Sequence, residues 1–189
     1  MDIDDSATTT PGLGGLGGVF RDHLGNWKMG FQENTPHTNP IMAELLALRR
    51  GLLLAKAHGL RKIQIDTGCI ALIDILSSNH RLYDNLLHEC RSLMTKLDAT
   101  MPADVFREQN SVADILAKAG ARMYSFGSLN IMLVPLLFVR VAFEPDTRGT
   151  LFTRQIRQSN IILRSRDVAE TSIWIDQVMT DATMLNPLT

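Results

Sequence analysis

Four acidic residues stand where their side chains could perform chemistry. Asp66 ends a short segment of alternating apolar and polar residues, and the ends of buried strands are common ligand sites. Glu44 and Asp114 belong to helical patterns, on or near the faces that turn inward, where a carboxylate needs a partner. Asp4 lies in an expected first strand. Together these four acids predict a site that binds cations.

The chemistry expected of such a site is metal-assisted hydrolysis. Mg²⁺, a hard divalent cation, takes oxygen ligands and usually keeps several waters beside a few carboxylates. Like charges raise one another's pKa, and a bound cation reverses that effect. Two ions about 4 Å apart can activate water and stabilise the leaving oxygen in phosphodiester cleavage. Two cysteines, Cys69 and Cys90, are too few for a zinc site and make a reducing compartment the default.

Each acid also has a simpler interpretation. Glu44 and Asp114 could interact with the positive ends of their own helix dipoles. Asp66 could cap the helix that follows its strand. Asp4, with Asp2 and Asp5, could belong to a solvated terminus. Each acid taken alone is therefore a weak signal, and the functional interpretation depends on the set.

Two further motifs favour other functions. Residues 12–17 match the GxGxxG pattern of dinucleotide-binding loops, but a strand and hairpin follow instead of the helix that this fingerprint needs, so glycines that allow close backbone approach are the better interpretation. Residues 65–68, Ile-Asp-Thr-Gly, match the signature of aspartic proteases, whose two carboxylates share a proton. The chain has no second copy, and its flanking helical patterns do not suit a short all-β protease, which would need a symmetric dimer around Asp66.

The elements that must position the acids can be predicted from apolar spacing and turn residues. Residues 13–20 and 27–31 predict a hairpin around a polar loop, and 43–58 predict a helix that stops at Gly59. The remaining expected elements are a strand at 62–66, helices at 70–76 and 82–97, a strand at 103–106, a helix at 111–122 and a short final helix at 172–184. This order predicts an α/β sheet with both antiparallel and parallel neighbours.

Composition excludes several classes of protein. The 189 residues are 45% hydrophobic and 21% charged, as in an ordinary globular domain, and the net charge of −1 gives no global attraction to a polyanion. The start lacks the layout of a secretory signal, and the longest uncharged stretch, 123–139, is shorter than the ~20 apolar residues of a spanning helix. We therefore expect no membrane association. The sequence contains no Lys/Arg cluster of the nuclear-localisation type, so it leaves the localisation open between cytoplasm and nucleus.

Five stretches, in this order, resemble one known family, the plant ribonuclease H-like domains of the reverse-transcriptase-like group, which occur as stand-alone proteins and in remnants of non-LTR retroelements. The matching stretches are Ile3-Asp4-Asp5-Ser6, residues 17–27 (GGVFRDHLGNW), 43–48 (AELLAL), 64–67 (QIDT) and 107–118 (REQNSVADILAK). The glycine-rich hairpin with Arg-Asp-His and the Arg-Glu-x-Asn-x-x-Ala-Asp block make the resemblance specific.

The resemblance implies a ribonuclease H-like fold, a five-stranded mixed sheet flanked by helices, in residues 1–125, with a C-terminal extension at 126–189. It also implies endonucleolytic cutting of the RNA strand of RNA/DNA hybrids with two Mg²⁺ or Mn²⁺ ions, by a protein expected to be a monomer. Matched to the motifs, the catalytic, metal-binding acids are Asp4, Glu44, Asp66 and Asp114. Asp4, Glu44 and Asp66 are expected to hold the first ion, and Asp4 and Asp114 the second. Expected substrate contacts are the backbone at Gly15, Gly17 and Gly18 and the side chains of Asn110 and Arg107.

This sequence departs from the family pattern at three positions. Asp5 replaces a Gly, Thr67 with Gly68 follows Asp66 where the family has Ser, and Asp104 stands where His is frequent. Only three residues precede Asp4, so a short first strand that begins inside the domain is expected. The short first strand and Asp5 favour a second hypothesis, a catalytically inactive, retroelement-derived domain that binds nucleic acid. In the extension, the five arginines of 148–166 form either a basic arm for phosphate or a solvated surface tail.

Overall fold

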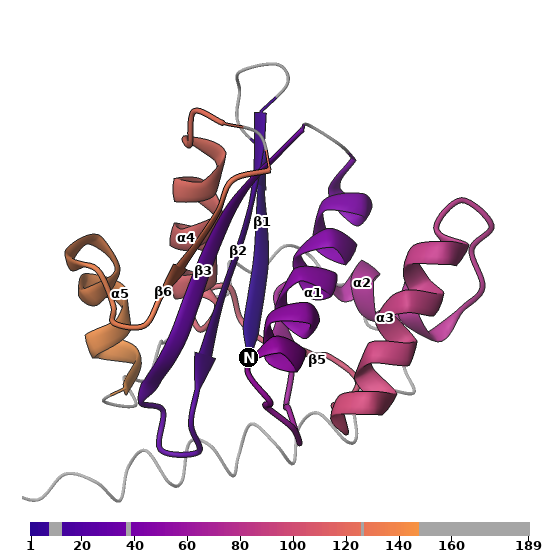
Figure 1. The fold of residues 1–189 in the computed structure, drawn as a ribbon, viewed down its shortest axis with the longest axis horizontal. Helices are drawn as coiled ribbons and strands as arrows, with labels where there is room; N and C mark the ends of the chain where they lie inside the picture. Colours follow the sequence, from indigo (N-terminus) through magenta and orange to yellow (C-terminus); the bar gives the residue numbers. More distant parts are fainter. Residues whose placement is uncertain (8–12, 37–38, 126, 148–189) are drawn as a thin grey trace, which may run out of the picture. The chain divides into compact units, whose positions relative to one another are not determined.

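A mixed six-stranded sheet forms the centre of the protein, with the order β5-β4-β1-β2-β3-β6 (Figure 1). The computed structural model describes residues 1–7, 13–36, 39–125 and 127–147. The neighbouring strands β1, β2, β3 and β6 are antiparallel to one another in turn. On the other side of β1, the strands β4 and β5 run parallel to it. The strands are β1 Asp2–Ala7, β2 Leu13–Arg21, β3 Trp27–Pro36, β4 Asp66–Thr67, β5 Ala103–Asp104 and β6 Leu129–Met132.

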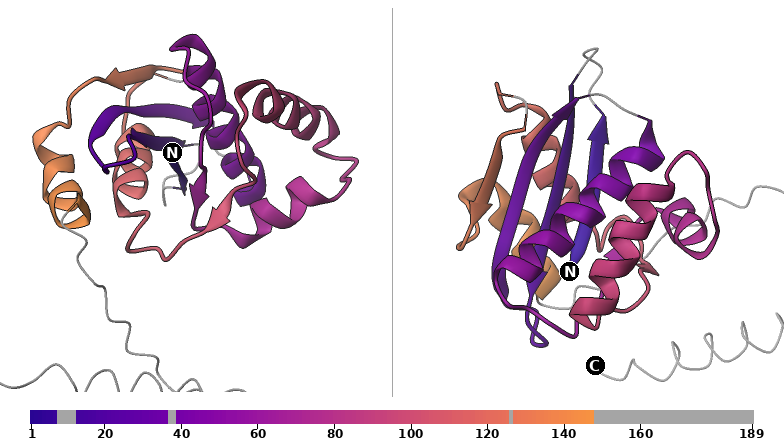
Figure 2. Two further views of the ribbon diagram at one scale, coloured as in Figure 1. Left: turned by 90° about the horizontal axis from the view of Figure 1, so that it is seen from below. Right: turned by 45° about the vertical axis from the view of Figure 1, so that its right-hand side comes forward.

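Helices cover both faces of the sheet (Figures 1 and 2). They are α1 Pro40–Ala57, α2 Ile70–Ser77, α3 Asp84–Leu97, α4 Ser111–Ala121 and α5 Leu137–Thr147. The helix α1 packs on one face of the sheet, with α2 and α3 beside it. The hydrophobic core on this face includes Ile3, Leu48 and Leu52. The helices α4 and α5 cover the other face, where Val19 and Leu116 are buried. The strand β1 therefore lies between two helical layers.

The predicted hairpin is confirmed as β2 and β3. One carboxylate oxygen of Asp22 accepts hydrogen bonds from the backbone N–H groups of Leu24 and Asn26, at 3.0 and 2.9 Å. Gly25 adopts a φ of +80°, which residues with a Cβ rarely adopt. The turn residues read from the sequence thus close the loop between the two strands.

The predicted helix that carries Glu44 is also confirmed, and it begins three residues earlier than expected, at Pro40. The side chain of Asn39 caps it by accepting a hydrogen bond from the backbone N–H of Met42 at 2.9 Å. The hydroxyl of Tyr83 donates to the same Asn39 oxygen at 3.0 Å. Gly59, with a φ of +67°, follows the end of the helix, as the sequence predicts.

The glycines of β2 let α4 approach the sheet closely. A Cβ placed on Gly15 would lie 2.0 Å from the carbonyl oxygen of Ala117, and one on Gly17 would lie 2.2 Å from the Ala117 nitrogen. These distances are too short for any side chain. The interpretation of the glycine-rich segment as a site of close backbone approach is therefore confirmed for these two residues.

The structure corrects the sequence prediction in two places. The strand expected at 62–66 is wrong, because only Asp66 and Thr67 pair as β4, and Lys62 has a left-handed φ of 54°. The sheet has a sixth strand, β6, which pairs with β3 beyond the five strands expected. Both β6 and α5 come from the segment assigned to the extension, whereas the basic segment and the final helix at 172–184 lie outside the described residues.

Candidate active site

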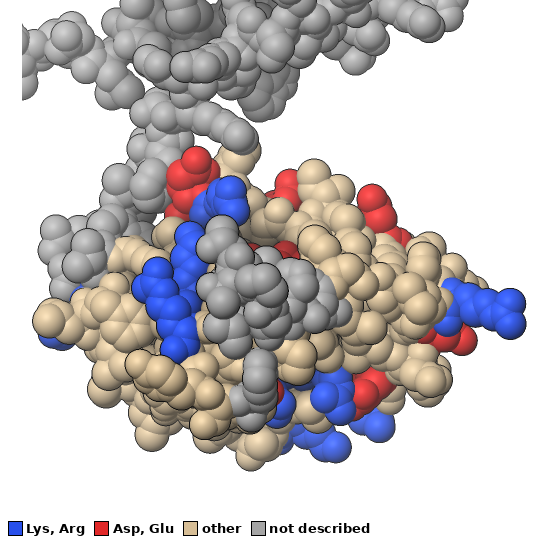
Figure 3. Space-filling view, turned by 90° about the horizontal axis from the view of Figure 1, so that it is seen from above, with Lys and Arg blue, Asp and Glu red and all other residues tan. Residues whose placement is uncertain are grey.

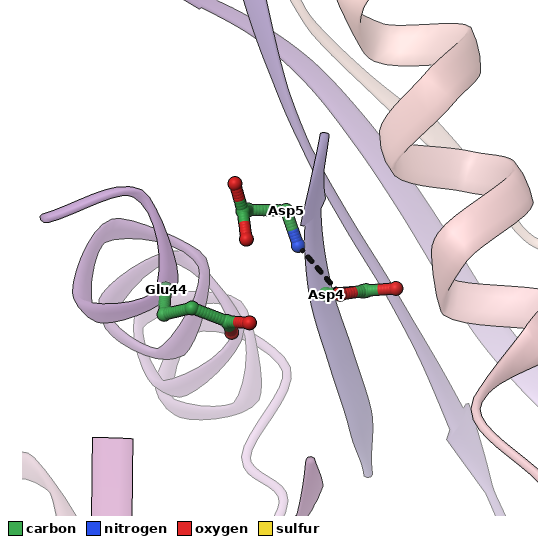
Figure 4. Close-up of side chains that lie close together, drawn as sticks. All are labelled: Asp4, Asp5 and Glu44. Carbon is green, nitrogen blue, oxygen red and sulfur yellow. Dashed lines mark hydrogen bonds between the residues drawn. The ribbon is translucent and has the colours of Figure 1, made fainter. Parts of the chain in front are cut away.

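Two adjacent acids on β1 face opposite layers of the structure. Asp4 pairs with Gly17 and Asp5 with Leu16 across the β1–β2 ladder. Because successive side chains of a strand alternate, the two carboxylates leave β1 in opposite directions. Figure 4 shows Asp5 on the side of α1, near Glu44, and Asp4 directed away from α1. The backbone N–H of Asp5 donates a hydrogen bond to Oδ1 of Asp4 at 3.0 Å, so this oxygen of Asp4 lies next to the backbone of Asp5.

The acids that the structure brings together are Asp4, Asp5 and Glu44. Each offers a carboxylate oxygen, and these three oxygens lie within 4.8 Å of one another. The strand β1, paired on both sides, fixes two of them, and the second turn of α1 fixes the third. The strand β1 runs from Asp2 to Ala7 and pairs with β2 along this length, so Asp4 lies inside a paired strand.

Burial and repulsion make Glu44 resist ionisation. Its side chain is buried, and this loss of solvation together with the charges of Asp5 and Asp4 raises its pKa to about 9. A hydrogen bond with the Cys69 thiol acts in the opposite direction. Burial likewise raises the pKa of Asp5. Both shifts favour the protonated form of these carboxyl groups when no cation is bound.

Asp4 connects this group to α4. Burial, followed by the charge of Asp114, raises the pKa of Asp4 to about 7. The charge of Arg107, an exposed residue just before α4, lowers it. Asp114 itself is paired with Lys118, one turn further along the helix. Asp4 and Asp114 thus interact electrostatically, although Asp114 is not among the three acids whose oxygens lie within 4.8 Å of one another.

Asp66 lies beside the start of β1. It pairs with Asp2, and its backbone N–H donates to the carbonyl oxygen of Met1 at 2.9 Å. It also lines a cavity of about 630 Å³ together with Arg21 and Lys62, and neither Asp4 nor Glu44 lines that cavity. The structure does not bring Asp66 into the group of three acids.

The expected substrate contacts lie in differing surroundings. Arg107 is exposed, whereas Asn110 is only 2% exposed, and its side-chain amide donates to the carbonyl oxygen of Ile3 at 2.9 Å. Gly15, Gly17 and Gly18 are buried in the sheet, where packing accounts for them. A positioning role for Asn110 and a packing role for the glycines follow from these contacts, and direct contact with substrate stays a prediction.

Sequence reasoning did not place Asp5 or Cys69 at the candidate site. Asp5 stands where the family pattern has Gly, so it counted as a departure. The thiol of Cys69, at the start of α2, interacts with both Glu44 and Asp5. Strand alternation could have revealed Asp5, because Ile3 faces α1 and Asp5 must share its side. Nothing in the sequence pattern points to Cys69.

The competing motifs are explained by the fold. Residues 14–17 lie within β2, which leads into β3 and not into a helix, so they do not form a dinucleotide loop. The Asp-Thr-Gly motif comprises β4 and the glycine that follows it, just before α2, in an α/β fold, unlike an all-β protease. The simpler interpretation of Asp66 as a helix cap is wrong, because Cys69 occupies the cap position of α2. Among the described helices, none is long and apolar enough to cross a membrane.

The group of three acids has the properties of a site for a hard divalent cation. All three donors are carboxylate oxygens. Oε2 of Glu44 is buried and has no hydrogen-bond partner among the described residues. Among the described residues, no ion pair joins Asp4, Asp5 or Glu44 to a Lys, Arg or His side chain. Mg²⁺ or Mn²⁺ therefore fits this arrangement.

Comparisons with known proteins agree with this architecture. The sequence model of a family described as reverse transcriptase-like matches residues 3–120. A curated "Putative ribonuclease H protein" of Arabidopsis thaliana is 29% identical over 161 residues, which cover 83% of this chain and 26% of the relative. The chain thus spans about a quarter of the length of that relative.

Solved structures share the fold. Ribonuclease H1 of the archaeon Halobacterium salinarum has 22% sequence identity and a TM-score of 0.58, covering 63% of this chain and 93% of that protein. LC11-RNase H1, solved in complex with an RNA/DNA hybrid, has 19% identity and a TM-score of 0.58, covering 64% and 94%. The six-stranded sheet with its flanking helices is therefore a ribonuclease H fold, and the chain belongs to the reverse transcriptase-like family.

Proposed function

We propose that this protein is a ribonuclease H-type endonuclease that hydrolyses the RNA strand of RNA/DNA hybrids with two Mg²⁺ or Mn²⁺ ions. The observation that carries the proposal is the group of three acids between β1 and α1 of a ribonuclease H fold, with the buried, unpartnered oxygen of Glu44. A structure of LC11-RNase H1, which has the same fold, contains an RNA/DNA hybrid. All the acids come from one chain, so a monomer suffices.

The roles of the acids follow from where they lie. Asp4 and Glu44 hold the first ion, since their oxygens come within 4.8 Å of each other. Asp4 and Asp114, whose charges interact across the β1–α4 contact, hold the second. When bound, the two ions supply an activated water and charge stabilisation at the phosphate. The family resemblance assigns the remaining ligand of the first ion to Asp66, which lies outside the group of three acids.

Substrate binding rests on contacts near the acids and not on overall charge. The face of the molecule in Figure 3 carries both basic and acidic side chains, in keeping with the net charge of −1. Arg107 is exposed and lies close enough to Asp4 to lower its pKa, so it is placed to bind a phosphate next to the ions. A hybrid would be read through its 2′-hydroxyls and phosphates, with little base specificity.

The test of the proposal is cleavage of a panel of labelled nucleic acids by the purified protein. Cutting of the RNA strand of a hybrid is expected with Mg²⁺ or Mn²⁺ and not with EDTA, while single-stranded RNA and double-stranded DNA stay intact. Attack by water leaves one phosphate monoester end and one hydroxyl end, whereas a contaminating metal-independent ribonuclease leaves a 2′,3′-cyclic phosphate. Cyclic phosphate ends, or cutting in EDTA, would contradict the proposal.

The second candidate function is binding of nucleic acid without catalysis. The presence of Asp5 in place of the family's Gly favours it, because an additional carboxylate changes the metal site. Hybrid binding by a folded protein that cuts no hybrid with either ion would support this candidate.

A further inference from the structure

We infer that Asp5 is the third protein ligand of the ion held by Asp4 and Glu44, in the position that the family resemblance gives to Asp66. The inference rests on the proposed function, since it concerns the first ion of the same site. It assigns a metal-binding role to a residue that the family pattern does not use.

The spacing of the three acids matches the size of a coordinated cation. Oxygen ligands lie about 2.0–2.1 Å from Mg²⁺ and about 2.3–2.6 Å from Ca²⁺. Two ligands on opposite sides of such an ion are therefore roughly 4–5 Å apart. The carboxylate oxygens of Asp4, Asp5 and Glu44 all lie within 4.8 Å of one another, so one ion can reach all three.

Glu44 provides evidence for a ligand that is independent of the spacing. Its side chain is 5% exposed, and Oε2 has no hydrogen-bond partner among the described residues. Figure 4 shows its carboxylate directed toward Asp5 and β1. A buried carboxylate oxygen without a partner is costly, and a cation between Glu44 and Asp5 would remove that cost.

Asp66 is placed less favourably for the same ion. The parallel β1–β4 register sets it beside Asp2, two residues before Asp4 along β1, which corresponds to about 7 Å of strand. Asp66 lines the same cavity as Arg21 and Lys62, and Glu44 is not among the residues that line it. Asp5, in contrast, faces α1 directly opposite Glu44 (Figure 4).

The inference is tested by isothermal titration of Mn²⁺ into the full chain, without nucleic acid. Asp5→Asn keeps the size of the side chain and removes its charge, Asp66→Asn does the same at the competing position, and Asp74→Asn is the matched control on an exposed face of α2. We expect Asp5→Asn to weaken Mn²⁺ affinity about tenfold or more, and Asp66→Asn and Asp74→Asn to stay within about twofold of the wild type.

The outcomes separate the inference from the proposed function. Loss of affinity in Asp66→Asn with none in Asp5→Asn would overturn the inference, as would a wild-type protein that binds no Mn²⁺. Asp5→Gly, which restores the family's residue, is a second test variant, and we expect it to weaken Mn²⁺ binding as Asp5→Asn does. Circular dichroism of each variant verifies folding. If Mn²⁺ binding depends on Asp5 but the wild type cuts no hybrid, the inference stands and the proposed function fails.

Discussion

The side-chain amide of Asn110 donates a hydrogen bond to the carbonyl oxygen of Ile3 at 2.9 Å, which ties the start of α4 to β1. Asp4 follows Ile3 directly, and Asp114 lies one turn into α4. Together with the packing of α4 on β1, this bond holds in place the two elements that carry the acids expected to hold the second ion. It explains why an asparagine is buried at a position where the family resemblance suggested a substrate contact.

Removing this tie should loosen the site as well as the fold. Asn110→Ala leaves the Ile3 oxygen without its buried partner, which is expected to cost about 1–3 kcal/mol of unfolding free energy. Denaturant unfolding measures the loss, with Asn79→Ala, in an exposed loop, as the control. A stability equal to wild type together with a raised KM for hybrid would instead show that Asn110 acts by contacting substrate.

The close contact between β2 and α4 predicts a sharp difference between two glycines. Gly17→Ala places a methyl group 2.2 Å from a backbone nitrogen of α4, so α4 must move away from the sheet. We expect a loss of about 3 kcal/mol or more, because backbone on both sides resists the shift. Gly68→Ala is the matched control, since its Cβ meets nothing nearer than 3.7 Å. Equal stability of the two variants in thermal unfolding would refute this packing role.

The raised pKa values predict how the stability of the metal-free protein depends on pH. In the unfolded chain Asp4 and Glu44 lose their protons near their ordinary pKa values of 3.8 and 4.5, whereas the folded protein keeps them to about 7 and about 9. Between these limits the folded state binds more protons, so its stability falls as pH rises. Scanning calorimetry in EDTA should show this fall, and Glu44→Gln should reduce it. A pH dependence identical in wild type and variant would contradict the assignment.

Arg107 has two expected effects that can be measured separately. As a phosphate ligand, its loss in Arg107→Ala should raise KM for hybrids of any sequence and reduce the salt dependence of binding by about one unit of slope. Arg107 also lowers the pKa of Asp4 through its positive charge. Loss of this charge in Arg107→Ala should therefore raise the pKa of Asp4 and move the pH–rate profile to higher pH. Arg81→Ala, in an exposed turn, serves as the control. An unchanged salt slope would exclude the phosphate contact.

The sequence predicted those parts of the fold that local rules determine. Asp22 and Gly25 close the hairpin as turn residues, and Gly59 follows the end of α1, whereas the start of α1 at Pro40, capped by Asn39, was not predicted. The strand at 62–66 was wrong because its alternating pattern describes burial of Ile63 and Ile65, whereas strand pairing depends on neighbours distant in sequence. The strand β6 was missed for the same reason, since only its pairing with β3 defines it.

The candidate site was predicted in part. Asp4 and Glu44 were chosen because of their motifs, and the structure brings their oxygens together. Asp5 was missed because a family pattern emphasises residues that are shared, and this acid stands where that pattern has Gly. The separation of Asp66 from the group follows from the β1–β4 register, which no local feature of the sequence determines.

The most direct test of the account is the rate of hybrid cleavage by wild type and Glu44→Gln at matched concentrations of folded protein in Mn²⁺. Glutamine keeps the shape of the side chain and removes the charge that a cation needs, so the variant should fold with equal or greater stability than the metal-free wild type. The account predicts cutting of the RNA strand by the wild type and a loss of at least about a hundredfold in the variant. Equal rates in the two proteins would show that the group of three acids is not the catalytic centre.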